Sequence, residues 1–289
     1  MSEMRILENE RLRVSVSDHG AELCSIYDKK ENREAVWTAD SAYWNRHAPV
    51  LFPFVGKVWA GKYRVGGVEY PMKTQHGFAR DKVFACLDKS AESVTHCLCA
   101  DDATRAIYPF DFKLTICHKL QGRQLAIEWV IENQGQGEMY FSIGGHPGFL
   151  MPQGLRKEDC LISFPGKTSL QYLSANDAGY ILPQIHTMEL AQGHAHWQDD
   201  IPATWIFEDR QVQTVGLSRP DGTPFVTMHC DAFPMLAIWA NPDGPFICLE
   251  PWVGRADDDG FAGGVEEKKN MQRLGAGEKQ EIAYTIDFH

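Results

Sequence analysis

Glu250 has the setting in this chain that most suggests catalysis. It follows the apolar run 246–249, which we expect to be a strand that ends at Pro251. Side chains alternate along a strand, so Glu250 shares a face with Cys248. If that face is interior, desolvation raises the pKa of the carboxyl and suits it to act as a general base near neutrality. The alternative is a solvent-exposed glutamate at a strand end.

Two other side chains would complement such a carboxyl. Trp252 offers a flat apolar surface of the kind on which sugar rings stack. His146 lies among three glycines and a proline in segment 144–148, just past an expected strand. Imidazole has the ordinary pKa nearest neutrality, and glycines allow close approach of a ligand, so His146 is a candidate acid partner. A structural or merely exposed histidine is the alternative.

Further polar candidates lie in the first third of the chain. His76 precedes a glycine, and Arg80 follows four residues later, a combination typical of a polar shell around a ligand. Arg46 lies between aromatic residues and the apolar, proline-containing stretch 48–53. The alternative for Arg46 is a solvated side chain or one stacked on an aromatic ring.

The motifs for metals and cofactors are weak. His194 and His196 could face one side of a strand, as in metal-binding β-barrels, with Asp199 or Asp200 as a third ligand. The glutamate of a cupin-like arrangement is missing, however, and the acidic run 257–259 lacks the ligand spacing of an EF-hand loop. The glycine-rich loops of nucleotide-binding proteins are also missing. We therefore predict neither a metal nor a cofactor.

Composition narrows the partners and the compartment. The formal charge of -11 over 289 residues disfavours nucleic acid and anionic membrane surfaces as partners. No signal peptide or membrane-spanning run is visible. The eight cysteines are scattered without a Cys-x-x-Cys pair, which favours free thiols in a reducing cytoplasm.

The periodicity is that of strands nearly throughout. Alternation and turn residues predict hairpins over 63–70, 112–131 and 212–229, and a strand over 139–143. Short helical turns are expected at 41–45 and around 266–272. These patterns predict an all-β sandwich or barrel in a single domain, residues 1–289, with 174–204 as a long surface excursion.

Four segments in order resemble the aldose 1-epimerase (galactose mutarotase-like) family, in its branch of short bacterial members. The resemblance extends over essentially the whole chain. The segments begin with His47-Ala48-Pro49-Val50-Leu51-Phe52-Pro53-Phe54-Val55-Gly56 and His76-Gly77-Phe78-Ala79-Arg80, followed by Gly145-His146-Pro147-Gly148-Phe149 and Leu249-Glu250-Pro251-Trp252.

The resemblance implies a large antiparallel β-sandwich with a sugar cleft on one sheet. It implies that Glu250 is the base, that His146 is the acid, and that His76 and Arg46 contact the sugar. Two features of galactose-specific members are not matched. Segment 142–146 lacks their Asn-x-Thr-x-His pattern. Their hydroxyl-binding aspartate has no clear counterpart here, with these candidates: Asp177, Asp199, Asp200 and Asp209.

The implied reaction is interconversion of the α and β anomers of an aldohexose by acid–base ring opening and closure, by a monomer or homodimer. One alternative is epimerisation of a hexose 6-phosphate, with a local basic pocket. The cations available for that pocket are Arg46, Lys57, Lys73, Arg80 and Lys82. Another is a non-catalytic carbohydrate-binding module, which would not need both Glu250 and His146. A metal-dependent enzyme built on His194 and His196 is a further alternative.

Overall fold

The computed structural model describes residues 3–197 and 204–289, and most of its regular structure is β-strand, which confirms the all-β prediction. The largest sheet is antiparallel and has nine strands. In spatial order they are β18 (His194–His196), β15 (Leu161–Ser163), β20 (Thr214–Ser218), β21 (Pro224–His229), β25 (Lys279–Phe288), β11 (Gln124–Asn133), β10 (Phe112–Gln121), β9 (Ser93–Cys99) and β8 (Ala85–Lys89).

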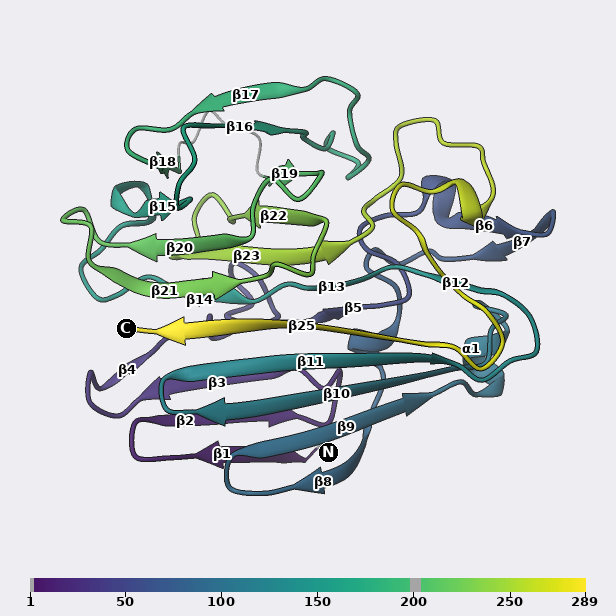
Figure 1. Cartoon of the computed structure of the whole chain (residues 1–289), viewed down its shortest axis with the longest axis horizontal. Coiled ribbons are helices and arrows are strands. Elements are labelled where there is room, and N and C mark those ends of the chain that lie inside the picture. The colour runs from purple at the N-terminus through teal and green to yellow at the C-terminus, as the bar shows by residue number, and fades with distance from the viewer. Residues whose placement is uncertain (1–2, 198–203) are drawn as a thin grey trace.

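Two further sheets pack near this one (Figure 1). A four-stranded sheet is made of β1 (Met4–Glu8), β2 (Leu12–Ser17), β3 (Leu23–Asp28) and β4 (Arg33–Glu34). A six-stranded sheet is made of β19 (Thr204–Phe207), β22 (Met235–Trp239), β23 (Phe246–Val253), β13 (Ile143–Gly145) and β5 (Val50–Leu51), with β14 (Gly148–Leu150) paired to β23.

Short ribbons and turns complete the fold. The ribbons are β6 (Lys62–Val65) with β7 (Val68–Pro71), β16 (Ser169–Tyr172) with β17 (His186–Glu189), and β12 (Met139–Phe141) with β24 (Gln272–Leu274). In the described ranges, regular helical structure consists of α1 (Asp102–Arg105) and of 3₁₀ turns at Trp59–Gly61, Ala79–Asp81, Lys157–Asp159 and Val265–Glu267. Among the described residues, no helix has the length and apolar character needed to span a bilayer.

The three predicted hairpins are confirmed. β6 and β7 join through Gly66 and Gly67, whose positive φ angles of 54° and 81° fit a primed turn. β10 and β11 pair over their full length around the Gly122 turn, and every second residue of β11 is buried. β20 pairs with β21 in the same way. Local alternation and turn chemistry were therefore enough to predict these elements.

Among the other local expectations, some were wrong. The strand expected to end at Pro251 continues to Val253. Pro251 lies between the stretch of β23 that pairs with β14 and the stretch that pairs with β13, so its missing N–H interrupts neither ladder. The expected strand 139–143 is divided between β12 and β13. The short helical turn expected at 41–45 is present, since the amides of Tyr43 and Trp44 donate to the Asp40 carbonyl at 3.0 and 2.9 Å. The described part of segment 174–204 includes β17, β18 and the first residue of β19.

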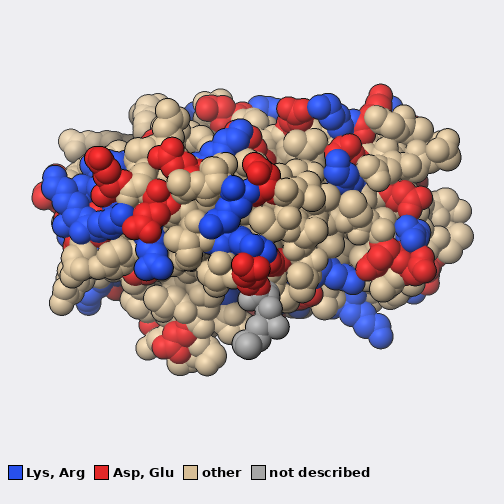
Figure 2. Space-filling model, turned by 90° about the horizontal axis from the view of Figure 1, so that it is seen from below, with Lys and Arg blue, Asp and Glu red and all other residues tan. Residues whose placement is uncertain are grey.

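The interior lies between the sheets. The four-stranded sheet lies against the β8–β10 part of the nine-stranded sheet, and His96 of β9 contacts Asp18 just after β2 at 3.0 Å. The six-stranded sheet lies against the other part, where Phe149 of β14 and Phe288 of β25 have ring centroids 6.5 Å apart. Figure 2 shows acidic and basic side chains intermingled on one face, so neither sign forms a continuous field there.

Candidate active site

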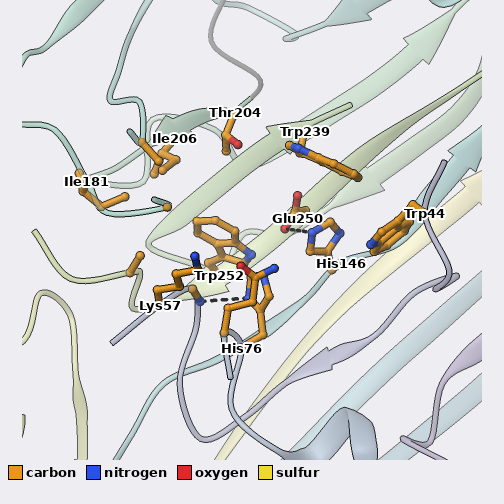
Figure 3. A pocket seen from close by; sticks show the side chains of 15 residues that line it. Trp44, Lys57, His76, His146, Ile181, Thr204, Ile206, Trp239, Glu250 and Trp252 are labelled. Atoms are coloured by element: carbon orange, nitrogen blue, oxygen red, sulfur yellow. Dashed lines mark hydrogen bonds and ion pairs between the residues drawn. The ribbon is translucent and has the colours of Figure 1, made fainter. Parts of the chain in front are cut away.

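A cavity of about 260 Å³ lies on the six-stranded sheet (Figure 3). Its wall contains five of the side chains named from the sequence or by the family resemblance, which are Lys57, His76, His146, Glu250 and Trp252. β23 carries the last two, and His146 directly follows β13. The rest of the wall is formed by Trp44, Gly56, Gln75, Ala175, Gly179, Ile181, Thr204, Ile206, Trp239 and Ala256.

Glu250 is an almost completely buried carboxyl, with 1% of its surface exposed. Every residue of β23 is buried. The strand lies inside the sheet, with β22 paired along one edge and β13 and β14 along the other. Neither carboxyl oxygen has a hydrogen-bond partner within the described parts of the chain. Burial therefore raises the pKa of Glu250 well above its ordinary value, as the interior alternative required.

His146 forms a pair with this carboxyl. Its Nε2 lies 3.2 Å from Oε2 of Glu250. The imidazole ring packs against Trp44 and Trp239, at centroid distances of 4.8 and 5.7 Å, and the two tryptophan rings also contact each other at 5.5 Å. Burial lowers the pKa of His146 to about 3. The uncharged forms of both groups are thus favoured, and a single proton transfer across 3.2 Å would convert them to carboxylate and imidazolium.

The backbone fixes the tautomer of His76. The Gly56 amide donates to Nδ1 of His76 at 3.0 Å, and the His76 amide donates to the Gly56 carbonyl at 2.7 Å. Burial, with help from the His146 ring, lowers the pKa of His76 well below its ordinary value. The neutral ring then carries its proton on Nε2, which makes it a hydrogen-bond donor.

The cations are arranged differently from the expectation. Arg46 forms an ion pair with Asp81 at 2.7 Å, and Arg80 donates to the Gln75 carbonyl at 2.7 Å. Neither arginine is part of the cavity wall, although the charges of both lower the pKa of His76. Among the described residues of the wall, the cation is Lys57. Of the five cations considered in the sequence for a phosphate pocket, Lys57 is thus the one that lies in this wall.

Unpartnered polar atoms are concentrated at the pair. In the described chain, Nε1 of Trp252 and Nδ1 of His146 are buried without a hydrogen-bond partner, as are both oxygens of Glu250. Such groups are costly to leave unsatisfied. A polyhydroxylated ligand would satisfy them, since each hydroxyl both donates and accepts.

The opposite end of the cavity is apolar. Ala175, Ile181 and Ile206 form it, and Ile181 and Ile206 belong to one apolar cluster with Trp252. Of the aspartates considered for sugar hydroxyls, Asp177 and Asp209 are not in the wall, and Asp199 and Asp200 lie outside the described residues. Sequence reasoning missed Trp44, Trp239 and the two isoleucines. Alternation along β22 places Trp239 on the same face of the strand as Ala237. That shared face is the local pattern from which the position of Trp239 could have been considered.

The histidines of β18 do not gather a third metal ligand within the described residues. His194 Nδ1 contacts the Ser163 hydroxyl at 3.0 Å, while His196 is exposed. The candidate ligands Asp199 and Asp200 are outside the part of the chain that is described.

Comparison with known proteins agrees with this fold. The profile of the aldose 1-epimerase family matches residues 4–201, a span that includes His76 and His146 but not Glu250. A galactose mutarotase related enzyme from Lactobacillus acidophilus is 30% identical, with a TM-score of 0.93 over 99% of this chain and 97% of that chain. A galactose mutarotase-like protein from Lactobacillus casei is 29% identical, with a TM-score of 0.92 over 99% and 100% of the two chains.

A further relative is similar over nearly the whole chain. Protein LacX from Lactococcus lactis subsp. lactis, in its plasmid form, is 29% identical over 93% of each chain. The antiparallel sheets therefore form a galactose mutarotase-like fold. This chain belongs to the aldose 1-epimerase family.

Proposed function

We propose that this protein interconverts the α and β anomers of an aldohexose, with Glu250 as base and His146 as acid. The observation that carries the proposal is the buried carboxyl and imidazole, 3.2 Å apart, in the wall of a cavity of about 260 Å³. Their pKa values are shifted in opposite directions, which is typical of an acid–base pair.

The chemistry requires only proton transfers. Glu250 as carboxylate removes the proton from the C1 hydroxyl, and His146 as imidazolium gives a proton to the ring oxygen. The bond between C1 and the ring oxygen breaks, leaving an aldehyde, a carboxylic acid and a neutral imidazole. Rotation about C1–C2 presents the other face of the aldehyde, and closure reverses both transfers. The state left after opening is the uncharged pair that burial favours.

The surrounding residues position the sugar. His76, with its proton on Nε2, and Trp252, with its free indole N–H, donate to hydroxyls or to the ring oxygen. Trp44 and Trp239 exclude water from the His146 ring. Arg46 and Arg80 act from outside the wall, by keeping His76 neutral.

The test is the decay of optical rotation of freshly dissolved α-glucose and α-galactose. The wild type should accelerate mutarotation of at least one sugar. Glu250→Gln keeps the side-chain shape and should lose about 10²–10⁴-fold of the acceleration while still binding sugar. Glu92→Gln, a substitution at an exposed glutamate, is the matched control and should leave the rate unchanged. A wild-type rate in Glu250→Gln would contradict the assignment of the base.

Lys57 favours a second candidate, a hexose 6-phosphate as substrate. Its ammonium group has no ion-pair partner among the described residues, although it lies in the cavity wall. Lys57→Met keeps most of the side-chain length and removes the charge. Under this alternative, the wild type has a far higher kcat/KM for glucose 6-phosphate than for glucose, and Lys57→Met loses that preference. Equal loss for both sugars would contradict it.

Sugar binding without any rate acceleration, for free and phosphorylated hexoses alike, would instead favour a carbohydrate-binding module. The compartment we propose is the cytoplasm, because all eight cysteines are free thiols.

A further inference from the structure

A third side chain lies beside the catalytic pair. Cys248 is two residues before Glu250 on β23, so the two share a face of the strand. One ligand atom each from His146, Cys248 and Glu250 lies within 4.8 Å of the other two. Cys248 is completely buried, and the proposed reaction gives it no task.

The three groups form a recognisable set of metal ligands. Thiolate, imidazole and carboxylate bind Zn²⁺ at about 2.3, 2.0–2.1 and 2.0–2.2 Å, commonly with a fourth position left open. Around a tetrahedral ion such atoms are roughly 3–4 Å apart. The cluster, whose ligand atoms lie within 4.8 Å of one another, would therefore need to contract by at most about 2 Å. The sulfur favours Zn²⁺ and related borderline cations over Mg²⁺ and Ca²⁺, which prefer oxygen ligands.

The Glu250 carboxyl is not committed to the backbone. Within the described chain its oxygens accept no backbone hydrogen bond, and Oε2 lies 3.2 Å from Nε2 of His146, which belongs to the same cluster. The comparable group of Glu22, Cys24 and His47 differs in this respect. There, Oε1 of Glu22 already accepts the amides of His47 and Ala48, at 2.7 and 3.0 Å, and so holds the backbone in place.

We propose that the catalytic cavity is also a Zn²⁺ site, in which His146, Cys248 and Glu250 bind the ion and thereby stop acid–base turnover reversibly. The fourth position faces the sugar cavity. On binding, the thiol and carboxyl protons pass to the buffer, and nothing is oxidised or reduced. A bound ion takes the lone pairs that both proton transfers need, so the ion acts as an inhibitor and not as a cofactor. The inhibition rests on the proposed epimerase function, whereas the binding does not.

The first test measures binding alone, with the purified full-length chain. Co²⁺ replaces Zn²⁺ as the probe, because a thiolate ligand produces a charge-transfer absorption in the near ultraviolet. The wild type should bind one equivalent and show this band, and Zn²⁺ should displace the Co²⁺. Cys248→Ala should lose the band and at least about 10–100-fold in affinity, the loss that outer-shell partners alone cause.

Two matched variants locate the site. Cys230→Ala removes an equally buried thiol outside the cluster and should keep the band. Cys24→Ala alters the other candidate group and should also keep it. A band that survives in Cys248→Ala, a band lost in Cys24→Ala, or no binding of Co²⁺ by the wild type would overturn the proposal.

The second test measures turnover. Zn²⁺ should inhibit mutarotation by the wild type, and a chelator should restore the rate. Cys248→Ala should remain active and should need at least about tenfold more Zn²⁺ for the same inhibition. Equal sensitivity of the two proteins would overturn the proposed site. If the wild type has no epimerase activity, the Co²⁺ band still decides the binding, so the two proposals fail separately.

Discussion

At the scale of single residues, one physical cause accounts for the shifted pKa values of both members of the proposed acid–base pair, Glu250 and His146. Burial disfavours charge, so it raises the pKa of Glu250 and lowers that of His146. The two atoms that exchange the proton are 3.2 Å apart, so the pair titrates as a unit. In its one-proton state it can supply either an acid or a base at each position, which a reversible ring opening requires.

The first prediction concerns the pH dependence of kcat/KM. Because the pKa of Glu250 is raised, the pair keeps one proton at pH values well above those at which an ordinary carboxyl has lost it. A second proton is added only as the pH falls toward about 3, the pKa of His146. We therefore expect a plateau that extends far into acid and an activity that falls as pH rises through the raised pKa of the pair. Rates of mutarotation measured in overlapping buffers, corrected for the spontaneous reaction, give the profile.

A second prediction tests whether burial is the cause. Trp44 covers one face of the His146 ring, so Trp44→Ala admits water to the pair. Both pKa shifts should shrink, and the plateau should become narrower from both sides. Tyr27→Ala, a change of a distant aromatic residue on β3, is the control for general destabilisation. A plateau of unchanged width in Trp44→Ala would mean that something other than desolvation sets these pKa values.

At the scale of elements, the predictable part of the site was the part encoded locally. Alternation and turn residues predicted the hairpins, and the alternation around Glu250 predicted the face that it shares with Cys248. The wall opposite was not predictable in this way. Ile181 reaches it through an isolated bridge to Asp258, a pairing across 77 residues of sequence for which no local pattern exists.

Which of two cations, Arg46 or Lys57, lies in the cavity wall was likewise not predictable from local sequence. Both cations border one segment, His47–Gly56, and sequence alone does not tell which end of it faces the cavity. Tertiary contacts decide. Asp81 pairs with Arg46 outside the wall, whereas the Asp257 amide donates to the Lys57 carbonyl at 2.9 Å and holds that residue beside the cavity.

The third prediction concerns the loop that carries His76. Gly77 has φ +67°, and a Cβ there would lie 2.2 Å from the Phe52 carbonyl oxygen. Gly122 has a similar φ of +57°, but a Cβ there would meet nothing within 4 Å. Gly122→Ala should therefore cost about 1–2 kcal/mol in the free energy of unfolding, for its backbone alone. Gly77→Ala should cost about 1–3 kcal/mol more, because the loop must also move.

Denaturant unfolding of the two variants measures that difference. Gly77→Ala should in addition raise KM for the sugar, since His76 moves with the loop, whereas Gly122→Ala should not. Equal losses of stability in the two variants would show that the close approach to Phe52 is accommodated without strain.

At the scale of the whole molecule, a buried polar contact joins two sheets. Arg5 of β1 binds Asp18 through two hydrogen bonds of 2.9 and 2.8 Å, and Asp18 contacts His96 of β9 at 3.0 Å. His118 of β10 lies behind it, with its ring centroid 6.5 Å from that of His96. Nδ1 of His118 is buried and has no hydrogen-bond partner in the described chain. His118, beside this contact between the sheets, is therefore kept uncharged in the folded protein.

The last prediction follows from that histidine. Burial, with a smaller effect of His96, lowers the pKa of His118 from 6.5 to about 3. The folded chain then binds fewer protons than the unfolded chain between these values, so stability is complete above pH 6.5 and is lost as pH falls toward 3. The loss over the full interval is on the order of 4–5 kcal/mol.

His118→Leu should flatten the fall of unfolding free energy between pH 6.5 and 4, whereas His196→Leu, at an exposed position, should follow the wild type. The other groups at this contact, Arg5, Asp18 and His96, are present in all three proteins, and the smaller effect of His96 on His118 is removed together with the His118 ring. A wild-type slope in His118→Leu would place the acid sensitivity of the fold elsewhere.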